Sequence, residues 1–98
     1  MTEVTVVHRP ERSRYEVRVD GETAGYTRYR RSPDGSYIDF RHTEIDPAYE
    51  GQGLGARLVA EALDDVRRRG DRAIATCPFV AAFVKRHPEY ADLVVADP

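Results

Sequence analysis

The sequence predicts an α+β fold, with a mixed, mostly antiparallel twisted sheet packed against two main helices. Three observations support this prediction. The first half alternates apolar and polar residues between turn signals, a glycine-rich run precedes a stretch with helical apolar spacing, and a short apolar strand leads into a second helix. The 98 residues fit one domain, so residues 1–98 are expected to fold together.

The first half is expected to form an antiparallel meander. Tyr15–Val19 alternates with period two, Asp20-Gly21 is a strong hairpin signal, and Ser32–Gly35 is a second turn. Pro47 ends the meander because proline donates no hydrogen bond to a ladder. The expected strands are Val4–Val7, Tyr15–Val19, Ala24–Tyr29 and Tyr37–Ile45.

The second half is expected to supply both helices. Leu54–Arg69 carries an apolar stripe at helical spacing, and Gly70 suits its C-terminus. A buried strand at Ala73–Thr76 and an edge strand at Leu93–Val95 should follow. The second helix should run from Phe79 to Arg86 after Pro78, with Phe79 and Phe83 in the core.

Composition narrows the function classes. Hydrophobic residues make up 41% and charged residues 33%, as in globular proteins. No apolar run approaches the roughly 20 residues of a membrane span, and no leader pattern is present, which favours a cytoplasmic protein without membrane association. The net charge of −2 disfavours nucleic acid as a partner. The single Cys77 excludes an internal disulfide, and no metal-ligand spacing occurs.

The run Asp46–Gly55 is the most informative stretch. Alternate glycines before a helix let the backbone approach an anion, and the free N–H groups there favour phosphate. A Walker phosphate loop would need a Gly-Lys-Ser/Thr ending, which is missing. Residues Gly51–Ala56 match the dinucleotide-binding pattern G-x-G-x-x-G/A. However, the run follows a meander, and too little chain remains after it for a dinucleotide-binding fold. A tight turn with no ligand is the remaining alternative.

The segment Ile45–Ala56 resembles the acetyl-CoA loop of the GNAT acyltransferase superfamily. The order of expected elements matches as well. Phe40–Thr43, Thr76–Val80 and His87–Tyr90 are similar to segments of the very short, single-domain members. The resemblance covers most of the chain.

This resemblance implies a minimal acetyl-CoA-binding domain with acetyl-CoA or CoA as co-substrate. Backbone groups of the glycine run would hold the CoA pyrophosphate. The backbone of Thr43–Ile45 would pair with the pantetheine arm, in a wedge flanked by Ala75–Cys77. The implied cofactor-binding residues are Thr43, Ile45, Gly51, Gln52, Gly53, Leu54, Gly55 and Ala56.

Two departures from the superfamily pattern stand out. Glu50 occupies a position that is usually Arg or Gln, and we expect its side chain to point away from the ligand. The two helices that usually lie between the first two strands are missing, since Val19 passes to Ala24 through a tight turn. The acceptor site is therefore undefined by the resemblance.

The catalytic candidates are Cys77, His42 and Glu44. Cys77 sits at a helix N-cap, where the dipole favours thiolate, although a small buried hydrophobe is an equal interpretation. His42 and Glu44 are candidates for the base, sharing a face with Ile38 and Phe40 if no bulge intervenes. The alternatives are a hydrogen-bonded strand histidine and a solvated glutamate.

The resulting hypothesis is an acetyl-CoA-dependent N-acetyltransferase that acts by direct amine attack or through an acetyl-Cys77 intermediate. The acceptor would be a small amine or a protein lysine, and the chain a monomer or weak dimer. A non-catalytic CoA-binding or regulatory module is the alternative. A nucleic-acid binder using the exposed arginines ranks last.

Overall fold

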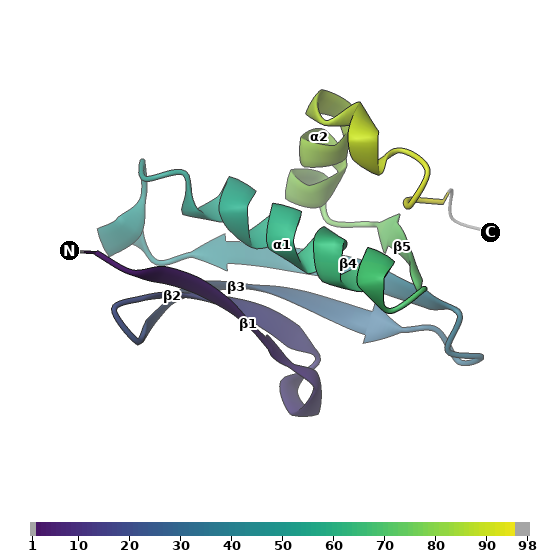
Figure 1. Cartoon of the computed structure of the whole chain (residues 1–98), viewed down its shortest axis with the longest axis horizontal. Helices are drawn as coiled ribbons and strands as arrows, with labels where there is room; N and C mark the ends of the chain where they lie inside the picture. The colour runs from purple at the N-terminus through teal and green to yellow at the C-terminus, as the bar shows by residue number, and fades with distance from the viewer. Residues whose placement is uncertain (1, 96–98) are drawn as a thin grey trace.

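The structure is a computed structural model that describes residues 2–95. One five-stranded sheet has its strands in chain order, and every neighbouring pair is antiparallel except the last, β4–β5. The predicted α+β fold is confirmed (Figure 1). The elements are β1 (Val4–Arg9), β2 (Arg14–Val19), β3 (Glu22–Arg31), β4 (Tyr37–Ile45), α1 (Leu54–Arg68), β5 (Arg72–Ala75) and α2 (Pro78–Arg86), with 3₁₀ turns at Pro10–Arg12, Pro47–Tyr49 and Pro88–Tyr90.

Both helices cover one face of the sheet, and the opposite face carries no helix within residues 2–95 (Figure 1). We call these the covered face and the open face. Within the described residues, the helical segments before α1 are the two 3₁₀ turns Pro10–Arg12 and Pro47–Tyr49, and no α-helix precedes it.

The core lies between α1 and the covered face. The apolar stripe predicted for this helix is buried, and it packs on aromatic residues of β2, β3 and β4. Tyr15, Tyr29 and Phe40 form a ring cluster with centroids about 6 Å apart, in which Tyr29 meets Phe40 edge-to-face. The buried stripe comprises Leu54, Leu58, Val59, Ala62, Leu63 and Val66.

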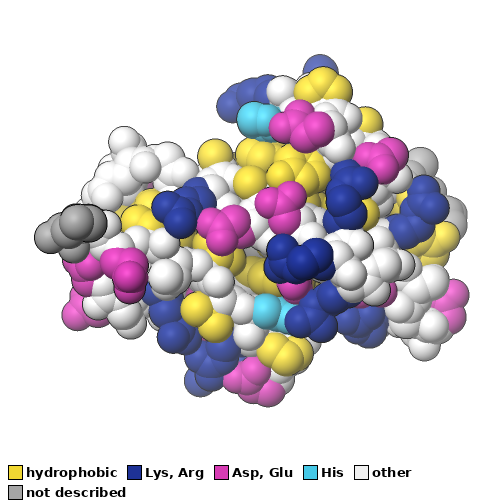
Figure 2. Space-filling view, viewed as in Figure 1, with side chains coloured by type: hydrophobic (Ala, Val, Ile, Leu, Met, Phe, Trp, Pro, Cys, Tyr) yellow, Lys and Arg dark blue, Asp and Glu magenta, His cyan; other side chains and the backbone are white. Residues whose placement is uncertain are grey.

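The surface of α1 carries ion pairs rather than a patch of one charge. Arg57 pairs with Glu61 at 2.8 Å, and Asp65 pairs with both Arg68 and Arg69. Figure 2 accordingly shows acidic and basic side chains interspersed on this side of the molecule. The predicted edge strand at Leu93–Val95 is reduced to a single parallel bridge between Val94 and Ala73.

Candidate active site

Strand β4 loses one of its two partners halfway along its length. Its first four residues, Tyr37–Phe40, pair with β5, and the Cys77 N–H donates to the Phe40 carbonyl at 2.8 Å. From His42 to Ile45 the strand pairs with β3 alone among the described elements. One edge of this stretch therefore offers backbone groups that no neighbouring strand satisfies.

A bulge at Arg41 reverses the faces of the strand. Arg28 lies opposite His42, whereas Tyr29 lies opposite Phe40, so Arg41 is an extra residue on β4. The expectation that His42 and Glu44 share the face of Phe40 is therefore wrong. They lie together on the open face, half or more exposed, whereas the partly buried Thr43 lies on the covered face.

The turn after β4 leaves the start of α1 open to an anion. The Asp46 carboxylate accepts the Ala48 N–H at 2.9 Å, which fixes the 3₁₀ turn. Gly51 and Gly53 then have φ of 81° and 74°, in the left-handed region that favours glycine. Gly53 is the N-cap of α1, with no side-chain cap and no acidic residue in the first turn. The N–H groups of this turn therefore remain free for a ligand.

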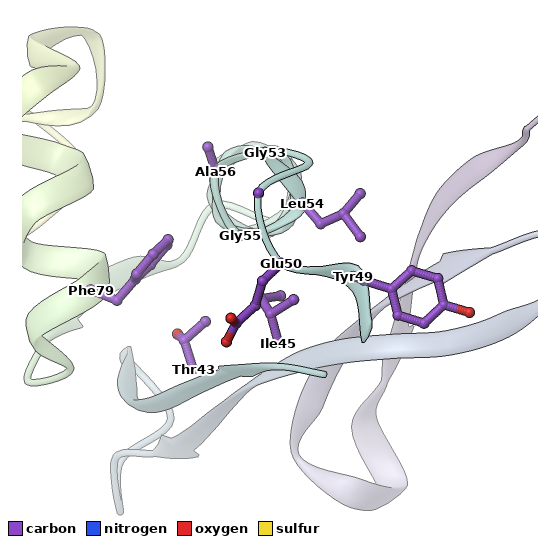
Figure 3. A pocket seen from close by; sticks show the side chains of 10 residues that line it. Thr43, Ile45, Tyr49, Glu50, Gly53, Leu54, Gly55, Ala56 and Phe79 are labelled. Carbon is purple, nitrogen blue, oxygen red and sulfur yellow. The ribbon is translucent and has the colours of Figure 1, made fainter. Parts of the chain in front are cut away.

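A cleft of about 430 Å³ joins this turn to the unpaired stretch of β4 (Figure 3). It brings together every residue expected for the cofactor except Gln52. Three further residues line it that were not expected to do so, namely Tyr49, Glu50 and Phe79. The full lining is Thr43, Ile45, Tyr49, Glu50, Gly51, Gly53, Leu54, Gly55, Ala56 and Phe79.

Phe79 and Glu50 differ from their expected positions. Phe79 was expected in the core, but it is 45% exposed and forms a wall of the cleft, whereas Phe83 is buried. A Cβ at Gly55 would lie 2.6 Å from the Phe79 ring, so glycine is needed there for the ring to pack on α1. Glu50 points away from Gly53 but into the same cleft (Figure 3).

Cys77 lies behind the cleft rather than on its surface. It is the N-cap of α2, only 3% exposed, and its thiol donates to the Thr43 hydroxyl at 3.4 Å. Thr43 and the fully buried Thr27 share a hydroxyl hydrogen bond of 2.9 Å. A short polar chain thus links the cleft lining to the core. Sequence reasoning missed Thr27 as a partner of Thr43. The pairing register of β3 with β4 would have revealed it, because Thr27 lies directly opposite Thr43.

The open face carries a second polar group, built on β3 and β4. The Tyr26 hydroxyl donates to Glu44 at 2.8 Å, and His42 Nε2 lies 3.6 Å from the same carboxylate oxygen. The hydrogen bond to Glu44, with some burial, raises the pKa of Tyr26. The Arg14 guanidinium lies 4.8 Å from the centre of the Tyr26 ring. Tyr26 therefore orients Glu44 beside His42.

Residues 2–95 contain no cluster of His, Cys, Asp or Glu that could hold a metal ion. Their longest helix also falls short of the length and apolarity needed to cross a membrane.

The sequence model of GCN5-related N-acetyltransferases matches residues 14–93. The chain belongs to this family. It is similar to Protein NATD1 of Danio rerio, with 27% identity over 96 residues that cover 96% of this chain and 87% of that protein. It is also similar to the N-alpha-acetyltransferase RimI of Mycobacterium tuberculosis, at 38% identity over 61 residues, or 53% of this chain and 38% of RimI.

Solved structures share the GCN5-related fold. A GCN5-like protein from Staphylococcus aureus, determined by NMR, matches with a TM-score of 0.67 at 20% identity, over 98% of this chain and 90% of that one. YncA from Salmonella typhimurium, determined with acetyl-CoA, matches with a TM-score of 0.53 at 23% identity, over 78% of this chain and 47% of YncA. At these identities the likeness concerns the fold alone.

Proposed function

We propose that this GCN5-related protein is an acetyl-CoA-dependent N-acetyltransferase that moves an acetyl group to an amine acceptor. One observation carries the proposal: the cleft joins the free N–H end of α1 to the unpaired stretch of β4. The first part suits a pyrophosphate, and the second suits an extended chain of amides. Acetyl-CoA has both groups and supplies the acetyl as a thioester.

The residues present fit this ligand. The backbone N–H groups of Gly51–Ala56, including Gln52, would receive the pyrophosphate, since no acidic side chain occupies the first turn of α1. The backbone of Thr43–Ile45 would bind the pantetheine amides along the open edge of β4. Phe79 would cover the arm from the side of α2.

His42 and Glu44 are proposed to serve the acceptor. An ammonium must lose a proton before its nitrogen can attack, and either side chain can accept that proton on the open face. The nitrogen then bonds to the thioester carbonyl carbon, and the carbon–sulfur bond breaks. CoA leaves as a thiolate and takes its proton from solvent, because its pKa lies near that of a free thiol, about 8.5.

Direct attack is favoured over an acetyl-Cys77 intermediate. Cys77 is buried, its thiol is committed to Thr43, and His42 lies on the opposite face of β4. A thiol is activated by an adjacent base or by a lowered pKa. The side-chain partner of Cys77 is a hydroxyl and not a base. Incubation with acetyl-CoA alone should leave the intact mass unchanged. A gain of one acetyl on Cys77, formed as fast as turnover, would establish the two-step route instead.

Ligand binding is tested first by thermal unfolding with CoA, acetyl-CoA and NAD. At a ligand concentration about 100 times the dissociation constant, binding adds about 2.7 kcal/mol. For a domain of this size, that should raise Tm by roughly ten degrees or more. A rise with CoA but not with NAD supports the proposal, and no rise with any of the three contradicts it.

Activity is tested by thiol release with peptides bearing a free α-amine, with lysine peptides and with small amines. The first class is included because a relative is named as an N-alpha-acetyltransferase. His42→Ala or Glu44→Gln should lower kcat by about 10²–10⁴-fold if that side chain is the base. His87→Ala is the matched control, since His87 is a similarly exposed histidine beyond α2.

The alternative is a CoA-binding module without chemistry. It is favoured by one observation, that the candidate bases face away from the cleft that would hold the thioester. In that case CoA would bind with the same affinity to wild type, His42→Ala and Cys77→Ala, and no amine would yield product.

A further inference from the structure

The cleft contains one charged side chain, that of Glu50. No cationic residue lines the cleft within residues 2–95. Glu50 follows the 3₁₀ turn in extended conformation, and its N–H bonds the Pro47 carbonyl. The backbone thus fixes where the side chain begins. An uncompensated carboxylate in a cleft built for an anionic ligand needs an explanation.

The direction of Glu50 divides the cleft into two electrostatic parts. The carboxylate extends toward the β4 side, where Thr43 and Ile45 lie, and away from the turn at Gly53 (Figure 3). The α1 end, with free N–H groups and a partial positive charge, favours anions. The β4 end, with a carboxylate and no cation, disfavours them.

The acyl group of a bound thioester would lie in the second part. An arm that starts at the α1 turn and runs along β4 ends near Thr43, beyond which the thiol of Cys77 lies. Phe79 bounds the same space on the other side (Figure 3). A negative charge on the acyl group would therefore lie on the same side of the cleft as the Glu50 carboxylate.

We infer that Glu50 selects the acyl donor by charge, favouring neutral acyl groups over those that end in a carboxylate. This inference rests on the proposed function, because it takes CoA thioesters to be the ligands. The donor class would be acetyl and other short uncharged thioesters. Malonyl and succinyl thioesters would bind more weakly because of charge repulsion rather than size.

Two ligands of similar size separate charge from length. Malonyl-CoA ends in a carboxylate, and butyryl-CoA ends in an ethyl group of comparable volume. Calorimetry would give the dissociation constants of both, and of CoA itself, for wild type and for Glu50→Gln. The ratio of the malonyl to the butyryl constant cancels any effect of Glu50 on the charges of CoA.

We expect wild type to bind butyryl-CoA more tightly than malonyl-CoA. Glu50→Gln should reduce the ratio of the two constants by roughly three- to tenfold, the range for one exposed charge pair at short distance. Glu50→Lys should reverse the preference. Glu11→Gln removes the same charge from the exposed turn between β1 and β2, and should leave the ratio unchanged.

An unchanged ratio in both Glu50 variants, with CoA still bound, overturns the inference and leaves the proposed function standing. Equal affinity of wild type for malonyl-CoA and butyryl-CoA would also overturn the inference without contradicting the proposed function. If neither CoA nor any thioester binds wild type, the proposed function fails and the inference fails with it. Since Glu50 is exposed, its variants should fold, which thermal unfolding checks directly.

Discussion

The two faces of the sheet differ in burial and therefore in what their side chains contribute to stability. The covered face buries Tyr15, Tyr29 and Phe40 under α1, so its side chains determine stability. The open face carries His42 and Glu44 in water, where substitution costs the fold little. The buried aromatic residues lie on β2, β3 and β4, and the exposed pair lies on β4 alone. The bulge at Arg41 exchanges the two faces within that strand. One extra residue thus separates the buried, structural part of β4 from the part that we propose to be reactive.

The largest expected contrast is between Phe40→Ala and His42→Ala. Phe40 is 1% exposed, and its removal should lower the free energy of unfolding by about 3–5 kcal/mol. His42→Ala should change it by less than about 0.5 kcal/mol. Urea titration measures both. Should Phe40→Ala fail to fold, Phe40→Leu gives a milder loss in the same direction. Equal losses at the two positions would break the comparison.

A smaller effect is expected from the polar chain that crosses the covered face. Thr43→Val leaves the buried Thr27 hydroxyl without its partner, which should cost about 1–3 kcal/mol. The double variant with Thr27→Val removes both groups and should be more stable than the sum of the single losses predicts. Unfolding of all four proteins measures this coupling. Strict additivity would show that the hydroxyl pair does not contribute.

The smallest effect concerns pH and compares two histidines. His8 on β1 stacks on Tyr15 and bonds the Tyr29 hydroxyl at 2.7 Å. Burial, and then the nearby Arg69, lower the pKa of His8 despite Asp65 close by, with smaller contributions from Arg31 and Glu11. The unfolded chain therefore binds this proton more readily than the folded chain, and stability should fall as pH drops below about 6.5.

The measurement is urea unfolding between pH 7.5 and 5 for wild type, His8→Gln and His42→Gln. His8→Gln should flatten the decline, whereas His42→Gln on the open face should retain it. Asp65 also makes stability depend on pH, but as an acid that loses its negative charge at lower pH. Its pKa is lowered because bonds from Tyr15, Arg69 and Arg68 outweigh burial, so its contribution is lost only below about pH 4. If stability still falls with pH in His8→Gln as it does in wild type, groups other than His8 cause the fall.

The existence and order of the main elements could be predicted because local signals set them, although β1 and β3 run two residues beyond their expected ends. Strand β4 runs from Tyr37 to Ile45 as expected, between the Ser32–Gly35 turn and Pro47. The bulge could not be predicted. After Phe40 the sequence reads Arg-His-Thr-Glu-Ile, in which only Ile45 is strongly apolar, so both alternations fit the pattern. The register with β3 decides between them.

The lining of the cleft was predictable where it depends on the glycine run and not where it depends on tertiary packing. Phe79 and Phe83 are four residues apart, a spacing typical of one buried helical face. The Phe79 ring nevertheless lies over Gly55 of α1, a contact that no local pattern reveals. Glu50 was expected to point away from the ligand on electrostatic grounds. The structure shows that its side chain points away from the turn at Gly53 but still lines the cleft, which depends on the course of the backbone.

The unpaired stretch of β4 has a consequence for the behaviour of the protein in solution. A strand edge with free N–H and C=O groups can also accept a strand from another molecule, which is how sheets aggregate. The charged Arg41 at the bulge and the cover by Phe79 restrict that approach. A ligand lying along the same edge would close it completely. The protein should therefore stay dispersed longer on storage with a saturating edge-binding ligand than without one.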